Sequence, residues 1–222
     1  VNYVMVNLPI PVGFWRSVGF SVNVFTVESF MDELAHAAGK DPVQFRLAHM
    51  EKGSRPYNIL SLLAEKGGWN RPVPNGRARG VAVHSCFESF AAHMAEVSVE
   101  AHGAVTVHKM VCAIDCGTAV YPDAIRAQAE GGVVMGLSPA FHERVRFENG
   151  GVKTVSYDDY PVLTMSEVPE IEVHIAKSNL KAGGVGEPVV PSVAPAVANA
   201  VFKATGVRLR ELPLKRDMLI KG

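Results

Sequence analysis

The chain has 222 residues, and its 22 Lys and Arg balance its 22 Asp and Glu, so the formal net charge at pH 7 is zero. A chain of this length can bury a sizeable core, while a neutral balance without a basic block excludes nucleic-acid binding that depends on charge alone. No apolar run approaches the roughly 20 residues that a membrane-spanning helix needs.

Residues 1–14 alternate apolar side chains at positions 4, 6 and 8, which predicts a strand ended by Pro9 and Pro11. The first residue is Val and no signal-peptide pattern follows, so we expect an internal cut in a longer chain. The next loop places Arg16 close to Gly19. A guanidinium offers a planar fork of donors to an anion or a polar ligand. The alternative is an Arg16 paired with a local carboxylate.

Three helices are predicted next. The first covers residues 24–38, the second starts at Asp41–Pro42, and the third covers about residues 57–67. Asp41 and Pro42 fit the N-cap and the first position of the second helix. Residues 70–79 are predicted to form a surface loop. The first helix is amphipathic. Its apolar face consists of Phe25, Phe30, Met31, Leu34 and Ala38. Its polar face consists of Glu28, Asp32 and Glu33. We expect Asp32, Glu33 and Arg46 to be solvated or structural.

From Gly80 the apolar period changes to two, which predicts strands. Residues 94–115 predict a hairpin with its tip at 101–104. His84 lies on the first of these strands, and we interpret it as a core or edge histidine rather than a metal ligand. A second hairpin is predicted over 140–155, and a further strand follows over 171–176.

Residues 115–123 join a strand to a helix that begins near Pro122. This helix contains Gly131, Gly132 and Gly136, although a glycine inside a helix costs up to about 1 kcal/mol relative to Ala. Such glycines usually allow close packing against another backbone or against a ligand. Both alternatives stay open from the residues alone.

A glycine-rich loop, Gly183–Pro188, precedes an apolar, Ala-rich segment that ends at Gly206. Its glycines allow a sharp turn and a close approach to a ligand, and the segment that follows predicts a buried helix. Glu187 is therefore presented on a rigid loop against apolar surface. A carboxylate in such a place is a candidate general base, and the alternative is an acid that caps the next helix.

Several common site patterns are absent from the sequence. There is no Gly-x-Ser-x-Gly elbow, Walker loop or His-Glu-x-x-His pattern, and Val189 replaces the third glycine of a dinucleotide fingerprint. The cysteines are odd in number and too sparse for a disulfide framework. An iron–sulfur cluster needs four thiolates, so this chain cannot build one alone. We interpret the thiols as buried and free at Cys86, Cys112 and Cys116.

The loop Gly184–Pro188, the helix after it and the segment Gly206–Leu214 together resemble the C-terminal signature of the molybdenum hydroxylases. This is the xanthine dehydrogenase and aldehyde oxidase family, and the resemblance is nearest to the isoquinoline 1-oxidoreductase β-subunit type. The stretches Trp15–Gly19 and Gln128–Gly136 resemble the same family. The resemblance extends from about Val12 to Leu214.

The resemblance implies an α+β (mixed α/β) fold that is the C-terminal portion of the family's molybdopterin-binding domain. We expect residues 1–222 to form one partial domain, with a strand and helices over 1–79 and mixed strands and helices over 80–222. The resemblance assigns Glu187 as the catalytic base. It also implies cofactor-binding positions, and no direct metal ligand, at Arg16, Gln128, Gly131, Gly132, Gly184 and Gly186.

The implied activity is oxidation of an aldehyde or N-heterocycle with oxygen derived from water. The implied cofactor is molybdopterin, with the cytosine dinucleotide form as one option, and electrons pass to 2Fe–2S clusters on a partner subunit. The other expected partners are the remaining part of the molybdopterin subunit and a small-molecule substrate. The family's further pterin-binding loops are not found in this chain, so we expect it to be inactive alone.

Two alternatives come from other classes of protein. One is a non-catalytic structural fragment or degenerate homologue that holds no cofactor by itself. The other is a ligand-binding domain that uses Arg16 and Gln128 for an anion.

Overall fold

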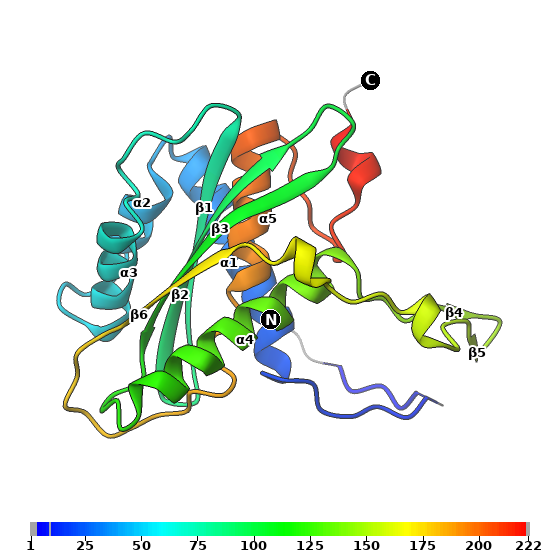
Figure 1. The fold of residues 1–222 in the computed structure, drawn as a ribbon, viewed down its shortest axis with the longest axis horizontal. Helices are drawn as coiled ribbons and strands as arrows, with labels where there is room; N and C mark the ends of the chain where they lie inside the picture. Colours follow the sequence, from blue (N-terminus) through cyan, green and yellow to red (C-terminus); the bar gives the residue numbers. More distant parts are fainter. Residues whose placement is uncertain (1–3, 9, 221–222) are drawn as a thin grey trace.

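The computed structural model describes residues 4–8 and 10–220. Its centre is a four-stranded sheet in the order β1-β2-β3-β6 (Figure 1). The strands are β1 (Arg77–Cys86), β2 (Ser89–Val99), β3 (Val105–Asp115) and β6 (Glu170–Ile175). The first three form an antiparallel meander, and β6 pairs parallel to β3. The predicted hairpin over 94–115 is confirmed as the β2–β3 pair.

Helices cover both faces of the sheet, which confirms the α+β class (Figure 1). On one face lie α2 (Pro42–Ala48) and α3 (Arg55–Lys66). On the other lie α4 (Pro122–Phe141) and α5 (Val193–Thr205). Side chains alternate along each strand, so the sheet contributes to a separate apolar cluster on each face.

The helix α5 lies directly on β1. A Cβ at Gly80 would overlap with the backbone nitrogen of Ala200, so only glycine allows this approach. Every residue from Val193 to Val201 is buried, as predicted for this helix. Gly206 ends α5 with φ 78°, the left-handed conformation that glycine adopts without strain.

The helix α1 (Gly19–Ala37) begins five residues before the predicted start at 24 and exposes part of the face that we expected to be buried. Phe30 is 56% exposed, while Glu28 and Asp32 are only 6% and 5% exposed. The prediction of an apolar buried face is therefore wrong here. The reason is an ionic network, in which Glu28 pairs with Arg46 at 2.9 Å and Asp32 pairs with Arg208 at 2.7 Å. Asp32 and Arg46 are structural rather than solvated.

The predicted strand over 1–14 is also wrong in the part that the structure describes, where residues 4–8 and 10–14 form no strand. The remainder of that prediction, residues 1–3 and 9, lies outside the described residues. The predicted loop 70–79 ends early, because β1 begins at Arg77. The guanidiniums of Arg77 and Arg79 both pair with Glu96 across β1 and β2, which stabilises a strand there.

The hairpin predicted over 140–155 is confirmed only at its tip. It consists of β4 (Phe147–Glu148) and β5 (Gly151–Val152), and α4 continues through residue 141. This hairpin lies on an arm that extends away from the sheet (Figure 1). Short 3-10 turns complete the secondary structure at Tyr157–Asp159, Met165–Glu167 and Arg216–Leu219.

The cysteines are free and buried, as predicted. Burial raises the pKa of the Cys112 thiol to about 12. Burial also raises the pKa of Cys86 to about 12, with the negative charge of Glu187 as a second cause. Within the described residues, no helix is long and apolar enough to cross a membrane.

Candidate active site

The glycine-rich loop is fixed against the turn between β1 and β2. Gly184 donates its N–H to the Phe87 carbonyl at 2.8 Å, and Ser89 Oγ donates to the Gly184 carbonyl at 2.6 Å. A Cβ at Gly183 would lie 2.5 Å from Ser89 Oγ, and one at Gly184 would lie 3.0 Å from Phe87 Cβ. These glycines therefore allow close packing on the scaffold, and they determine where Glu187 emerges.

Arg16 reaches this loop from the segment before α1. Its Nε donates to the Gly186 carbonyl at 2.5 Å, and its Nη2 donates to Gln128 Oε1 at 2.9 Å. Within the described part of the chain it forms no ion pair with a carboxylate, so the alternative of a local carboxylate partner is not observed. Burial lowers the pKa of Arg16, and the charge of Glu187 acts in the opposite direction. The guanidinium stays charged at neutral pH.

Gln128 stands in the first turns of α4, exposed to solvent. A guanidinium can only donate, so the Gln128 atom that faces Arg16 must be the amide oxygen. The amide nitrogen consequently points away from Arg16. Its two N–H donors remain available to a ligand.

Glu187 is half-buried and is contacted by Ser17. The Ser17 N–H donates to Glu187 Oε1 at 2.9 Å, and the Ser17 hydroxyl donates to the Glu187 carbonyl at 2.8 Å. Ser17 is a residue that the sequence reasoning missed. The signal available in the sequence was its position directly after Arg16, with a hydroxyl group.

The glycines of α4 and of the glycine-rich loop divide into tightly packed positions and positions with open space beside them. A Cβ at Gly132 would overlap with the Val189 side chain, and one at Gly136 would lie 2.7 Å from Val193 Cβ, so both are packing positions. A Cβ at Gly131 or Gly186 would meet nothing within 4 Å. The packing explanation therefore holds for Gly132, while Gly131 and Gly186 leave open space beside Gln128 and Glu187.

Gly132→Ala is expected to destabilise the chain by about 1–3 kcal/mol, because a methyl group is forced into a buried contact with Val189. The matched control is Gly131→Ala, which adds the same methyl group in open space and should be neutral or stabilising by up to about 1 kcal/mol, since Ala favours helix. Urea unfolding of both variants measures the difference. Equal stability of the two variants would contradict the packing account of Gly132.

A buried histidine contacts the start of α5, the helix that follows the loop carrying Glu187. His93 is fully buried, and its Nδ1 lies 2.7 Å from Ser192 Oγ at the start of α5. Burial lowers the pKa of His93 to about 3, and neighbouring His84 acts in the same direction. Burial lowers the pKa of His84 to about 4. Both side chains are therefore neutral at physiological pH, as expected of core histidines.

The neutral state of His93 predicts a pH-dependent stability. Its pKa is about 3 in the folded chain and 6.5 in the unfolded chain, so below pH 6.5 only the unfolded state takes up the proton. The free energy of unfolding should therefore be highest above pH 6.5 and fall as pH decreases, by up to about 1.4 kcal/mol per pH unit for this group. In His93→Gln, urea unfolding between pH 4.5 and 8 should show a shallower dependence. An unchanged slope would show that His93 is not the group responsible.

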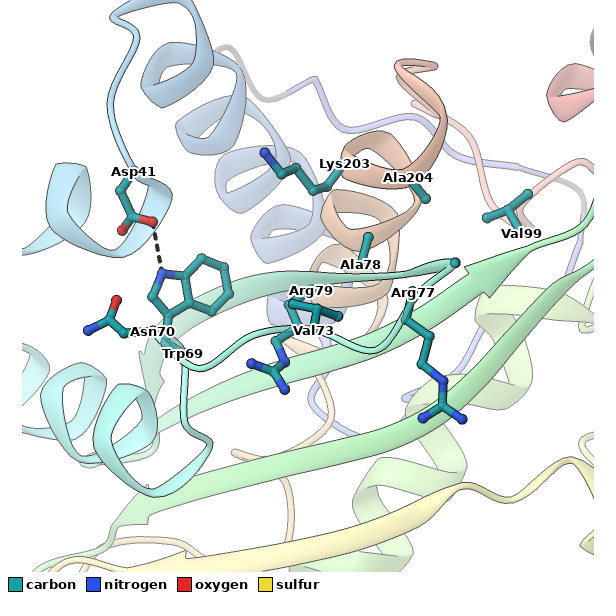
Figure 2. Close-up of a pocket in the computed structure, with 11 residues that line it drawn as sticks. Asp41, Trp69, Asn70, Val73, Arg77, Ala78, Arg79, Val99, Lys203 and Ala204 are labelled. Atoms are coloured by element: carbon teal, nitrogen blue, oxygen red, sulfur yellow. Dashed lines mark hydrogen bonds between the residues drawn. The ribbon is translucent and has the colours of Figure 1, made fainter.

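A separate hollow of about 540 Å³ lies between α2, the loop after α3 and the end of α5 (Figure 2). None of the predicted site residues lines it. Trp69 Nε1 donates to Asp41 Oδ2 at 2.8 Å there, and Arg77 and Arg79 are already paired with Glu96. The convergence of Arg16, Gln128 and Glu187 remains the candidate site.

Comparison with known proteins identifies the family. Residues 26–169 match the model of the molybdopterin cofactor-binding domain. The chain belongs to this family. The matched residues include Gln128 and the glycines of α4, while Arg16 and Glu187 lie outside the match.

Two curated relatives support this membership, and the predicted family is confirmed. The chain is 34% identical over 210 residues to the β-subunit of isoquinoline 1-oxidoreductase from Brevundimonas diminuta, covering 93% of this chain and 27% of the relative. It is 38% identical over 222 residues to a nicotinate dehydrogenase subunit from Pseudomonas putida, covering 91% of this chain and 18% of the relative. The chain thus spans less than a third of the length of these relatives.

Solved structures show the same fold. Quinoline 2-oxidoreductase from Pseudomonas putida 86 matches with a TM-score of 0.81 and 14% identity, covering 95% of this chain and 53% of that chain. Aldehyde oxidoreductase from Desulfovibrio gigas matches with a TM-score of 0.76 and 14% identity, covering 93% and 41%. At such low identity the likeness concerns the fold alone.

Proposed function

We propose that this chain is part of the molybdopterin-binding subunit of a molybdenum hydroxylase that oxidises an aldehyde or N-heterocycle, with Glu187 as the base. The observation that carries the proposal is the convergence of Arg16, Gln128 and Glu187 from three separate segments. Arg16 bonds to Gln128, which is 112 positions away, and to Gly186, which is 170 positions away. A purely structural fragment has no need of such a polar cluster beside open glycines, so the cluster favours the enzyme.

The positive charge of Arg16 and the N–H donors of Gln128 suit an anionic, polar cofactor. The Gln128 amide nitrogen points away from Arg16, and the positive charge of Arg16 lies directly behind it. Gly131 and Gly186 leave the adjacent surface without side chains, so a ligand can approach the backbone closely. We assign Gln128 as the residue that donates to molybdopterin, and Arg16 as the residue that orients Gln128 and anchors the Gly186 peptide.

When bound, the cofactor supplies the oxygen-transfer and electron-transfer chemistry. The protein's part is to orient the reactants and to move one proton. Glu187 Oε1 is engaged by Ser17, so Oε2 is the oxygen that accepts the proton. Glu187 is half-buried on a loop fixed by backbone hydrogen bonds, which limits the reorganisation needed during the reaction.

The finer points of the proposal concern substrate and partners. The relatives named for isoquinoline and nicotinate favour an N-heterocycle, and they are named as subunits, which favours a multi-subunit enzyme. Large apolar side chains lie almost fully exposed at Phe14 (98%), Tyr157 (95%) and Met165 (88%). We assign these exposed side chains to contacts with the remaining part of the molybdopterin subunit. We further propose a 2Fe–2S subunit as electron acceptor and the cytosine dinucleotide form of the cofactor.

The test is elemental analysis of the complete enzyme purified from its native host with its co-purifying subunits. Near-stoichiometric molybdenum, with iron in the amount of 2Fe–2S clusters, is the expected result. Release of CMP from the cofactor on acid hydrolysis would identify the cytosine dinucleotide form. A folded, complete preparation without molybdenum would overturn the proposed function in favour of a non-catalytic homologue.

A further inference from the structure

Ser17 holds Glu187 at two atoms. Its N–H donates to the carboxylate oxygen Oε1 at 2.9 Å, and its hydroxyl donates to the main-chain carbonyl of Glu187 at 2.8 Å. The exposed fraction of Ser17 is 0%, so water cannot take the place of these contacts. Arg16 anchors the preceding peptide at the Gly186 carbonyl. Two adjacent residues thus fix both the main chain and the side chain of the proposed base.

The backbone around Ser17 is held in an unusual conformation. Ser17 has φ 76° and Val18 has φ 44°, a region that β-branched residues in particular avoid. The turn is closed by the Val18 N–H, which donates to the Trp15 carbonyl at 2.8 Å. Strained backbone of this kind persists only where surrounding contacts fix it, and it is concentrated at functional sites. Here the strained turn is the element that directs the Ser17 N–H at Glu187.

The last side-chain torsion of a glutamate has a broad energy profile, so a free carboxylate rotates easily. The hydrogen bond from the Ser17 N–H removes this freedom at Oε1. No residue in the described ranges donates to Oε2, so this oxygen stays free to accept, next to Gly186, where a Cβ would meet nothing within 4 Å. A base must meet its proton at hydrogen-bond distance, so small errors in its placement lower the rate.

We propose that Ser17 is the positioning residue of the base: its hydroxyl holds the Glu187 main chain in place, and this keeps the Ser17 N–H on Oε1 and leaves Oε2 as the reactive oxygen. This inference rests on the proposed function. Ser17 itself touches neither cofactor nor substrate in this account, and it acts only through Glu187.

The test uses Ser17→Ala and Ser17→Gly in the complete enzyme. Both variants keep the N–H and lose the hydroxyl, and glycine also accepts φ 76° without strain, so it provides a folded variant if alanine does not. We expect kcat to fall about tenfold in both variants, since one hydrogen bond and some precision of the base are lost. KM should stay within about twofold, and the molybdenum content should be unchanged.

Ser21→Ala is the matched control. Ser21 Oγ donates to the Arg16 carbonyl at 3.3 Å in the next turn and does not contact Glu187. Its kcat should stay near the wild-type value. A loss of kcat in the Ser17 variants that merely follows a loss of molybdenum would mean that Ser17 is a folding residue, and the inference would fail.

Combining Ser17→Ala with Glu187→Gln in one variant tests separately whether Glu187 is the base and whether Ser17 positions it. If Ser17 acts through Glu187, then Ser17→Ala should have little further effect on the rate of cofactor reduction in the Glu187→Gln background. An equal loss in both backgrounds would overturn the inference. If Glu187→Gln alone keeps wild-type turnover, the proposed base is wrong. If it abolishes turnover while both Ser17 variants keep full kcat, only the role of Ser17 is wrong.

Discussion

Glu187→Gln in the complete enzyme is expected to lower kcat by about 10²–10⁴-fold while the cofactor stays bound. Gln has nearly the shape of Glu, and its amide oxygen can still accept from the Ser17 N–H. The amide nitrogen would then occupy the place of Oε2, where it cannot accept a proton. Arg16 and Gln128 are untouched, so the cofactor content should equal that of the wild type.

Glu130→Gln is the control for this prediction. Glu130 is an exposed carboxylate on α4, close in sequence to Gln128, and its side chain forms no hydrogen bond or ion pair with Arg16, Gln128 or Glu187. Steady-state turnover per molybdenum should be near wild-type for this variant and strongly reduced for Glu187→Gln. Near wild-type turnover of Glu187→Gln would show that another group takes the proton.

Arg46→Met is expected to destabilise the chain by about 3–5 kcal/mol. Arg46 is 1% exposed and donates to Glu28 Oε2 at 2.9 Å and to the Glu28 carbonyl at 2.8 Å. The Val83 N–H also donates to Oε2. Burial raises the pKa of Glu28, and Arg46 is the main group that opposes this effect. Removing Arg46 leaves a buried carboxylate without its counter-ion.

Urea unfolding at pH 7 measures this loss, with Arg126→Met as the control. Arg126 pairs with Asp123 on the exposed side of α4, and its removal should change stability by less than about 0.5 kcal/mol. The double variant Glu28→Met/Arg46→Met should recover part of the loss, because two apolar side chains replace the pair. A double variant as unstable as the sum of the two single variants would contradict the pairing account.

The elements that were predicted well are those set by local rules. Asp41 accepts the N–H groups of Val43 and Gln44 at 2.9 Å, as expected of an N-cap. Gly206 ends α5 in the left-handed conformation, and the β2–β3 hairpin follows from its period of two. Each of these depends on residues within a few positions of one another.

The face of α1 could not be predicted because it depends on distant partners. Glu28 and Asp32 belong to residue types that are rarely buried unless they are paired. Their partners Arg46 and Arg208 lie on other segments, and periodicity within the helix carries no information about them. The same limit applies to Arg77 and Arg79, whose shared partner Glu96 stands on the next strand.

The site shows a similar division. Arg16, Gln128 and Glu187 were proposed from their residue types and from the family resemblance, and the structure brings them together. Ser17 was missed because its contact with Glu187 joins positions 170 apart and uses a backbone N–H, which every residue except proline has. The glycines of α4 could be separated into packing and open positions only once the neighbours of each were known.

A crystal structure of the complete, cofactor-loaded subunit would show whether Gln128 and Glu187 face the molybdenum cofactor. We expect the Gln128 amide nitrogen at about 2.7–3.2 Å from a cofactor acceptor. We also expect the Glu187 carboxylate within hydrogen-bond reach of the reacting centre, directly or through one water. A cofactor bound elsewhere, with the space beside Gly131 and Gly186 filled by protein side chains, would overturn the proposed site.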